Sequence, residues 1–297
     1  MGRPAAPWRI KGKKVYRGYS QAELDAQYDV AEPPGEKRDR ERQWVADENA
    51  RVRAAHDCRL DVPYGAGAAE RLDIFPARKP GAPVAVFIHG GYWKQFSKED
   101  ESLYADLFVP AGAAYVSVDY ALAPGATLDE IVRQCRAATA WVAKNAAGFN
   151  GDPTRIHLIG RSAGAHLAAM VLASDWPSLG LARSPVAGAT LISGLYDLEP
   201  ILLAFTNEWT RLDRATAFRL SPQFHFLDAP VPLIVAWGGA ETAEFIRQSQ
   251  DYAVAAQARG FPCTTIEIPG ARHSGSRLVL YDRASALTRA VLAQAGL

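Results

Sequence analysis

The sequence predicts an α/β fold with a mostly parallel central sheet flanked by helices. The runs 83–89, 113–119 and 155–159 are largely continuous and apolar, which is typical of strands buried on both faces, and three further strands complete the set. Longer segments of helical character separate them, as crossover helices do in a parallel sheet. Two short runs, 59–63 and 71–75, flank a glycine-rich turn and predict an antiparallel hairpin at the start. The six strands are 83–89, 113–119, 155–159, 187–192, 232–237 and 264–268, and the helices are 128–146, 163–173, 243–259 and 277–295.

Bulk composition restricts the class of protein. The 297 residues are 48% hydrophobic and 22% charged, and the formal net charge of +1 does not favour a nucleic-acid or anionic-membrane partner. Cys58, Cys135 and Cys263 are too few and too widely spaced to predict a disulfide framework or a zinc site. The basic first residues lack the apolar core of a signal peptide, and no apolar run approaches about 18 residues. We therefore expect a cytoplasmic protein without a membrane segment.

The most informative motif is Gly160-Arg161-Ser162-Ala163-Gly164, which directly follows the apolar strand 155–159. The two glycines allow a sharp bend from strand to helix, so that the Ser162 hydroxyl projects above the sheet. The new helix then directs its N–H groups at whatever binds there. In this context the G-x-S-x-G pattern predicts a nucleophile elbow, a feature of the α/β-hydrolase fold. Because the pattern alone occurs by chance, its partners decide the interpretation.

A second motif, His89-Gly90-Gly91-Tyr92-Trp93, ends a buried strand upstream. An acyl-transfer enzyme must stabilise the negative oxygen of a tetrahedral intermediate, and rigid backbone N–H groups do this well. Glycines after a strand permit the necessary close approach. The predicted oxyanion hole therefore consists of the N–H groups of Gly91, Tyr92 and Ala163. We expect His89 to fix the loop through its ring rather than to act as the base.

His273 is the predicted general base. It follows the last core strand, as the chain order nucleophile, acid, histidine of this fold requires. It would deprotonate Ser162 and later protonate the leaving group. The other histidines fit less well, because they lie outside strand ends, within a strand, or, like His166, on the helix after the nucleophile.

Two strand-end carboxylates compete for the role of orienting His273. Glu241 follows the strand 232–237, and Asp197 follows the preceding strand 187–192. We favour Glu241, because the strand just before the histidine strand usually supplies the acid in this fold. Asp197 would then cap the helix that follows it. Asp228, in a loop before a proline, is a third and weaker candidate.

The chain divides into an N-terminal extension, 1–57, and a catalytic domain, 58–297. The extension is charge-rich, with helices predicted at 20–28 and 36–55 on either side of Pro33-Pro34-Gly35. It is either a solvated appendage or a segment that packs near the active-site mouth. Within the catalytic domain, the long connection 195–229 predicts a helical lid with helices near 198–205 and 210–220, because insertions of this length are usually functional.

Motifs over nearly the whole chain belong together. They are HGGYW at 89–93, GRSAGAH at 160–166, SGLYDLEP at 193–200, ETAEFIRQS at 241–249, and Gly18-Tyr19-Ser20 with Leu24, Asp25 and Tyr28. This set resembles the kynurenine formamidase (arylformamidase) branch of the α/β-hydrolases, near the hormone-sensitive-lipase-like esterases. The first two motifs are typical of the fold, and the others favour the branch.

This resemblance implies a serine hydrolase that cleaves N-formylkynurenine to kynurenine and formate, with further activity on aryl esters. Two residues depart from the family pattern: Glu241 stands where Asp is common, and Arg161 stands where His is common. The change beside the nucleophile leaves the substrate open. The alternatives are a short-acyl carboxylesterase or arylesterase, a carbamate hydrolase, and a non-catalytic receptor on the same fold.

A small-molecule substrate is the expected partner, with no nucleic acid and no membrane, and the sequence leaves open a homodimer. Ser, His and acid supply both nucleophile and proton transfer, so no metal or organic cofactor is needed. An aryl leaving group would stack on aromatic side chains. The candidate substrate-binding residues are Tyr92, Trp93, Arg161, Phe205 and Trp209.

Overall fold

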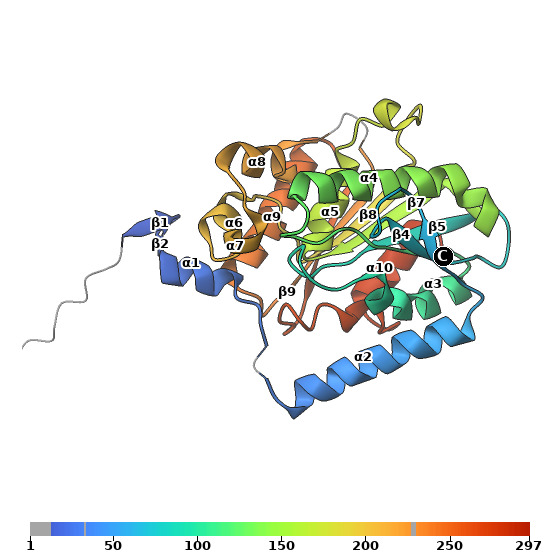
Figure 1. Ribbon diagram of the computed structural model, residues 1–297. Helices are drawn as coiled ribbons and strands as arrows, with labels where there is room; N and C mark the ends of the chain where they lie inside the picture. Colours follow the sequence, from blue (N-terminus) through green and yellow to red (C-terminus); the bar gives the residue numbers. More distant parts are fainter. Residues whose placement is uncertain (1–12, 33, 227–229) are drawn as a thin grey trace, which may run out of the picture.

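An eight-stranded sheet, in the order β10-β9-β8-β7-β5-β6-β4-β3, forms the centre of the molecule (Figure 1). The computed structural model describes residues 13–32, 34–226 and 230–297. The six strands from β10 through β5 to β6 in this order pair in parallel with their neighbours. In contrast, β4 pairs antiparallel with both β3 and β6. The predicted α/β fold, with its mostly parallel sheet and antiparallel start, is confirmed. The strands are β3 (Arg59–Pro63), β4 (Arg71–Phe75), β5 (Ala82–Ile88), β6 (Ala114–Val118), β7 (Gly151–Arg161), β8 (Val186–Ile192), β9 (Leu233–Gly238) and β10 (Cys263–Ile268).

Helices cover both faces of this sheet, which explains the continuous apolar strands. All seven residues of β5 are buried. Val84, Val86 and Ile88 belong to one hydrophobic cluster, and the alternating Ala85 and Phe87 belong to the other. The first cluster includes side chains of α4 (Leu128–Asn145), α5 (Ala163–Leu172) and α9 (Ala243–Ala258), and the second includes those of α2 (Glu36–Ala55), α3 (Ala105–Ala111) and α10 (Ala286–Ala295) (Figure 1).

The predicted last helix, 277–295, is wrong in its first half. A short 3-10 turn, η5 (Leu278–Leu280), is followed by a break, and α10 begins only at Ala286. Polar side chains explain the interruption. The Ala284 N–H donates to Asp282 Oδ1 at 2.9 Å, and the Thr288 N–H donates to Ser285 Oγ at 3.0 Å, which makes Ser285 the N-cap of α10.

The N-terminal segment lies against both sides of the domain. It contains the two-stranded ribbon β1 (Lys14–Tyr16) and β2 (Tyr19–Ser20), then α1 (Gln21–Tyr28) and α2. Ser20 and Glu23 form the predicted capping box. Leu24 and Tyr28 of α1 are buried in the first cluster, whereas Val45 and Val52 of α2 are buried in the second.

The insertion after β8 is helical, but its helices are shorter than predicted. It contains α6 (Glu199–Leu203), α7 (Asn207–Thr210), α8 (Arg214–Arg219) and the turn η4 (Pro222–Phe224). The sequence did not predict η1 (Lys98–Tyr104) and α3, which connect β5 to β6; the remaining 3-10 turns are η2 (Ala146–Phe149) and η3 (Pro177–Leu179). None of the helices in the described part of the chain is long and apolar enough to span a bilayer.

Candidate active site

Ser162 lies at a strained bend between β7 and α5. Its φ of 56° and ψ of −124° are unfavourable for a residue with a side chain, and its N–H donates to the Ile192 carbonyl at 2.8 Å. A Cβ on Gly160 would lie 2.2 Å from the Gly164 carbonyl oxygen, and a Cβ on Gly164 would lie 2.0 Å from the Ile88 carbonyl oxygen. Both glycines of the motif are therefore required by close backbone approach, and the geometry is that of a nucleophile elbow.

His273 and Ser162 come together from distant parts of the chain. His273 follows β10, and its Nε2 lies 3.0 Å from Ser162 Oγ, within hydrogen-bond distance. Both residues are buried, with 2% of Ser162 and 8% of His273 exposed. The Phe245 ring of α9 packs on the imidazole, with 4.3 Å between ring centroids. This arrangement can pass the Ser162 proton to the imidazole.

Glu241 is the carboxylate that faces His273. Its Oε2 lies 3.5 Å from His273 Nδ1, at the outer limit of a hydrogen bond. Its Oε1 accepts from the Ser193 hydroxyl and, at 3.0 Å, from the Gly238 N–H. Burial raises the pKa of the Glu241 carboxyl, but hydrogen bonds from His273, Ser193 and Gly238 outweigh it and hold the pKa below its usual value. Glu241 is therefore an anion at neutral pH.

Asp197 takes no part in this arrangement. Its Oδ1 accepts from the Glu199 N–H at 3.0 Å, at the beginning of α6, as expected of a residue that stabilises a helix start. Its Oδ2 accepts from the Tyr16 hydroxyl at 3.4 Å. The third candidate, Asp228, lies outside the described residues. Of the two described carboxylates, only Glu241 can orient His273.

The protonation state of His273 suits a general base. Burial lowers the pKa of its imidazole below the usual value, the Glu241 carboxylate opposes the shift, and the positive charge of Arg161 adds to it. The net direction is downward, so the ring is neutral at pH 7. A neutral imidazole can accept a proton from Ser162.

The glycine loop after β5 lies directly against the elbow. A Cβ on Gly90 would lie 2.8 Å from the Arg161 carbonyl oxygen and 3.2 Å from Ser162 Cβ. Gly91, Tyr92 and Trp93 have φ values of 97°, 51° and 58°, a run of left-handed residues that is strained for the two aromatic ones. The N–H groups of Gly91, Tyr92 and Ala163 have no acceptor among the residues that the structure describes. They are therefore available to an oxyanion.

His89 and His166 support the site without touching the Ser162 hydroxyl. The His89 ring stacks on Tyr120 at 4.1 Å between centroids, and its Nδ1 lies 2.9 Å from the Gly90 carbonyl oxygen. Burial lowers the pKa of His166 to about 4, so this ring is neutral. Its Nδ1 accepts from the Trp93 indole at 3.2 Å, and its Nε2 donates to the Leu220 carbonyl at 2.8 Å.

The candidate substrate-binding aromatic residues divide into two groups. Trp93 is fully buried, with 0% exposure, and it packs in the core against His166, so its contact with substrate stays a prediction. Tyr92, Phe205 and Trp209 form a cluster, in which the Trp209 ring lies 6.0 Å from Tyr92 and 5.6 Å from Phe205. The Trp209 indole donates to the Tyr92 carbonyl at 3.0 Å, which links the insertion to the glycine loop.

Arg161 is buried against the loop that carries the base, and its predicted contact with substrate stays a prediction. Its guanidinium donates to the His273 carbonyl and, at 3.1 Å, to Ser276 Oγ. Sequence reasoning missed Ser276 and Ser193, which lie beside the triad and are 3.3 Å apart through their hydroxyl oxygens. The position of Ser193 at the end of β8 could have identified it, but no local signal marks Ser276.

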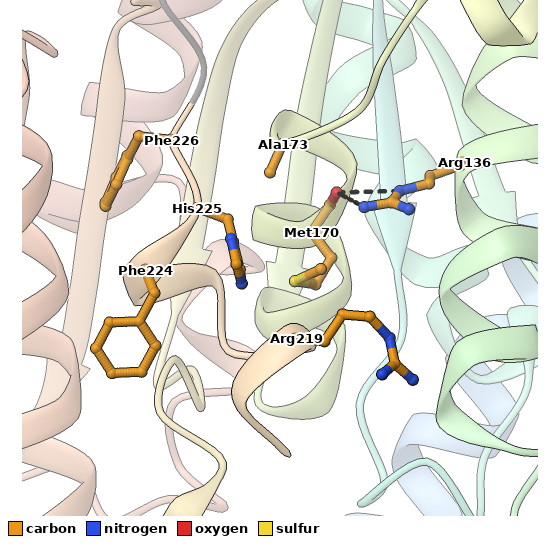
Figure 2. Close-up of a pocket in the computed structure, with 7 residues that line it drawn as sticks. All are labelled: Arg136, Met170, Ala173, Arg219, Phe224, His225 and Phe226. Carbon is orange, nitrogen blue, oxygen red and sulfur yellow. Dashed lines mark hydrogen bonds between the residues drawn. The ribbon is translucent and has the colours of Figure 1, made fainter. Parts of the chain in front are cut away.

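A surface cavity of about 370 Å³ lies at the other end of α5 (Figure 2). About 15 Å of helix separates that end from Ser162. Arg136 donates to the Met170 carbonyl there, through Nε at 3.3 Å and Nη2 at 3.1 Å, and Arg219 is paired with Asp129 at 2.9 Å. Since it lies at the opposite end of α5 and is lined by none of Ser162, His273 and Glu241, this cavity is not the catalytic site. No group of three or more His, Cys, Asp or Glu within the described ranges could hold a metal ion.

The comparisons with known proteins agree with this geometry. The BD-FAE family model matches residues 72–176. The kynurenine formamidase of Danio rerio is 33% identical over 83% of this chain and 85% of its own length, and that of Salmo salar is 34% identical over the same shares. The esterase LipQ of Mycobacterium tuberculosis is 28% identical over 79% of this chain and 60% of its own length.

Solved structures show the same fold. A candidate thioesterase from Silicibacter sp. TM1040 superposes with a TM-score of 0.79 at 28% identity, covering 91% of this chain and 99% of that one. An esterase of Pyrobaculum calidifontis has a TM-score of 0.68 at 23% identity, covering 93% and 95%, and its likeness concerns the fold alone.

Proposed function

Because the chain belongs to the kynurenine formamidase family of α/β-hydrolases, we propose that its substrate is an aryl formamide of the N-formylkynurenine type. The chain is a serine hydrolase of the formamidase and esterase class. The observation that carries the proposal is the contact of 3.0 Å between Ser162 Oγ and His273 Nε2 in a buried site. Family membership then favours a formyl group as the acyl part.

The proposed reaction is acyl transfer in two steps. Ser162 Oγ attacks the formyl carbon while His273 Nε2 takes its proton, and the N–H groups of Gly91, Tyr92 and Ala163 stabilise the resulting oxyanion. His273 then protonates the departing aryl amine, which leaves a formyl ester on Ser162. Water attacks this ester, His273 accepts the proton of the water and returns it to Ser162, and formate is released. Glu241 holds the imidazole tautomer throughout.

The surroundings of Ser162 support a small acyl group. Ser162 is only 2% exposed, and Gly90 and its neighbours leave little room on the side of the glycine loop. The aryl part would lie against Tyr92, Phe205 and Trp209, whose rings already contact one another edge-on. Lys94 Nζ lies 3.5 Å above the Trp209 ring and adds a positive charge at this cluster, which suits a substrate carrying a carboxylate.

We propose that the N-terminal segment and the insertion 195–226 together cover this site. Three hydrogen bonds support the assignment for the segment. Tyr92 Oη donates to the Tyr28 carbonyl at 2.6 Å, Thr242 Oγ1 donates to the Gln27 carbonyl at 2.7 Å, and Ser274 Oγ donates to Glu32 at 2.7 Å. The cytoplasmic location and the homodimer stay predictions.

A short-acyl ester hydrolase is the second candidate. Its support is the 28% identity to the esterase LipQ and to the candidate thioesterase of solved structure. The test compares formate release from N-formylkynurenine with hydrolysis of p-nitrophenyl acetate by the same preparation. A kcat/KM for the formamide at least tenfold above that for the ester supports the proposal. Rapid ester hydrolysis without formate release would reject it in favour of the esterase.

A further inference from the structure

Arg161 is a buried cation next to the nucleophile that the proposed reaction does not use. It is the last residue of β7, and only 9% of it is exposed. Burying a guanidinium is costly unless every part of it is paired, so its partners indicate its role. The inference below rests on the proposed serine-hydrolase mechanism, but not on the identity of the substrate.

The partners of Arg161 all belong to the loop that carries the base. Its Nη2 donates to the His273 carbonyl, and its Nε donates to Ser276 Oγ at 3.1 Å. Ser276 Oγ itself donates to the same His273 carbonyl at 2.8 Å. Arg161 and Ser276 therefore both donate to the His273 carbonyl. The Arg161 side chain in addition joins this carbonyl to Ser276, three residues further along the loop. Since Ser162 is the next residue after Arg161, the nucleophile and the anchor of its base belong to one continuous segment.

A second set of charges lies behind Arg161. Glu101 of η1 is buried, with Arg277 Nη2 at 3.4 Å from its Oε1, and Arg277 Nη2 also donates to the Asp100 carbonyl at 2.6 Å. Burial lowers the pKa of Arg161, Arg277 adds to the shift, and Tyr104, Glu101 and Glu241 oppose it. An arginine stays protonated nonetheless. The site therefore contains a buried positive charge that is bonded to the backbone of His273.

We propose that Arg161 is a positioning residue for His273: it anchors the loop backbone of the base within reach of Ser162 and makes no contact with substrate. The residue before the nucleophile then positions the base. Arg161 stands where the family commonly has histidine, and this difference alters how His273 is held rather than which substrate is bound. Arginine suits this position because its planar fork can donate to two acceptors at once, which lysine cannot.

The charge of Arg161 gives this role a signature in the pH profile. The groups that face His273 are Glu241 from the turn after β9, Arg161 from β7 and the apolar Phe245 from α9, with the partly exposed Glu32 bonded to the adjacent Ser274. Arg161 lowers the pKa of His273, and Glu241 raises it. Removing Arg161 raises the pKa of the base, so the acidic limb of the rate profile moves to higher pH.

The test compares Arg161→Gln and Arg161→Lys with Arg136→Gln. Arg136 is a matched control, because it also donates to a backbone carbonyl, that of Met170, but at the far end of α5. For Arg161→Gln with p-nitrophenyl acetate we expect kcat to fall about 10- to 100-fold with KM within about twofold. The acidic limb should shift upward in kcat/KM and in the rate at which a fluorophosphonate modifies Ser162. Arg136→Gln should lower the melting temperature and leave both pH profiles in place.

Arg161→Lys protects the test against misfolding of the glutamine variant. It keeps the charge but not the two-acceptor geometry, so it should lose part of kcat while the acidic limb stays near its wild-type position. A folded Arg161→Gln with an unchanged acidic limb, or with a loss confined to KM, overturns the inference, as does wild-type kcat in Arg161→Lys. The fluorophosphonate measurement needs no formamide, so failure to release formate would reject the proposed substrate and leave this result standing.

Discussion

The catalytic edge of the sheet and the cover that we propose for it are held in different ways. Ser162, Glu241 and His273 follow β7, β9 and β10, whose parallel register fixes where each loop begins. The proposed cover is made of 13–32 and 195–226. The first part is attached to this edge through the side chains of Tyr92, Thr242 and Ser274, and the second part through the Trp209 indole, which donates to the Tyr92 carbonyl. The catalytic step therefore depends on residues fixed by the sheet, whereas entry of substrate to Ser162 depends on a few separate side-chain contacts. Substitutions at the edge should lower kcat, and substitutions in the cover should change KM.

The largest effect is expected for Ser162→Ala. The variant removes the only hydroxyl within hydrogen-bond distance of His273 Nε2 in the described part of the chain, and no acyl-enzyme can form. We expect kcat to fall by about 10⁴-fold or more, with a melting temperature close to that of the wild type. Steady-state assays and fluorophosphonate labelling would measure this. Retention of even a tenth of the activity would contradict Ser162 as the nucleophile.

Glu241→Gln should have the next largest effect. An amide still fits the space and can still accept from Ser193 and Gly238, but it no longer stabilises an imidazolium on His273. We expect kcat to fall by about 10²- to 10⁴-fold. Asp197→Asn is the matched control, because Asp197 contacts the beginning of α6 instead, and it should stay within about threefold of the wild type. The reverse order of effects would transfer the role of the acid to Asp197.

The catalytic edge could be predicted from the sequence because its signals are local. A glycine pair around Ser162, and single polar residues just past apolar strands, mark positions that a parallel sheet brings to one edge. The helix break before Ala286 was missed for an equally local reason. Asp282 and Ser285 bond to nearby N–H groups, and this turn chemistry overrides the apolar spacing of the segment.

The side-chain directions of Arg161 and Trp93 could not be predicted in the same way. Arg161 bonds to the His273 carbonyl more than a hundred residues further along the chain, and Trp93 donates to His166 from a loop with left-handed backbone. Such contacts depend on how separate loops pack. Proximity in sequence to Ser162 or to the glycine loop therefore indicated the correct region of the molecule but not the bonding partners of the two side chains.

The pH profile tests whether edge and cover together keep His273 neutral. Burial lowers the pKa of its imidazole below 6.5, the usual value, so the base is unprotonated at pH 7 and becomes protonated only at more acidic pH. We expect kcat/KM to be level near pH 7, with an acidic limb whose midpoint lies below 6.5. The slope below that midpoint should be tenfold per pH unit. A midpoint above 6.5 would mean that the Glu241 carboxylate outweighs burial.

Tyr92→Phe is expected to have the smallest effect, and it separates the two regions most directly. It keeps the ring and the backbone N–H of Tyr92 but removes the hydroxyl that donates to the Tyr28 carbonyl at 2.6 Å. A buried carbonyl without a donor costs about 1–3 kcal/mol, which should loosen α1 over the site. We expect KM for an aryl formamide to rise about three- to tenfold, with kcat within about twofold, measured by formate release.

The matched control for this prediction is Tyr16→Phe. Tyr16 belongs to the same N-terminal segment, but its hydroxyl donates to Asp197 and not to a carbonyl beside the glycine loop. This variant should leave KM unchanged. If Tyr92→Phe lowers kcat at constant KM instead, the Tyr92 hydroxyl supports the oxyanion loop itself. The N-terminal segment would then belong to the catalytic edge, because its contact with Tyr92 would act on the chemical step rather than on access.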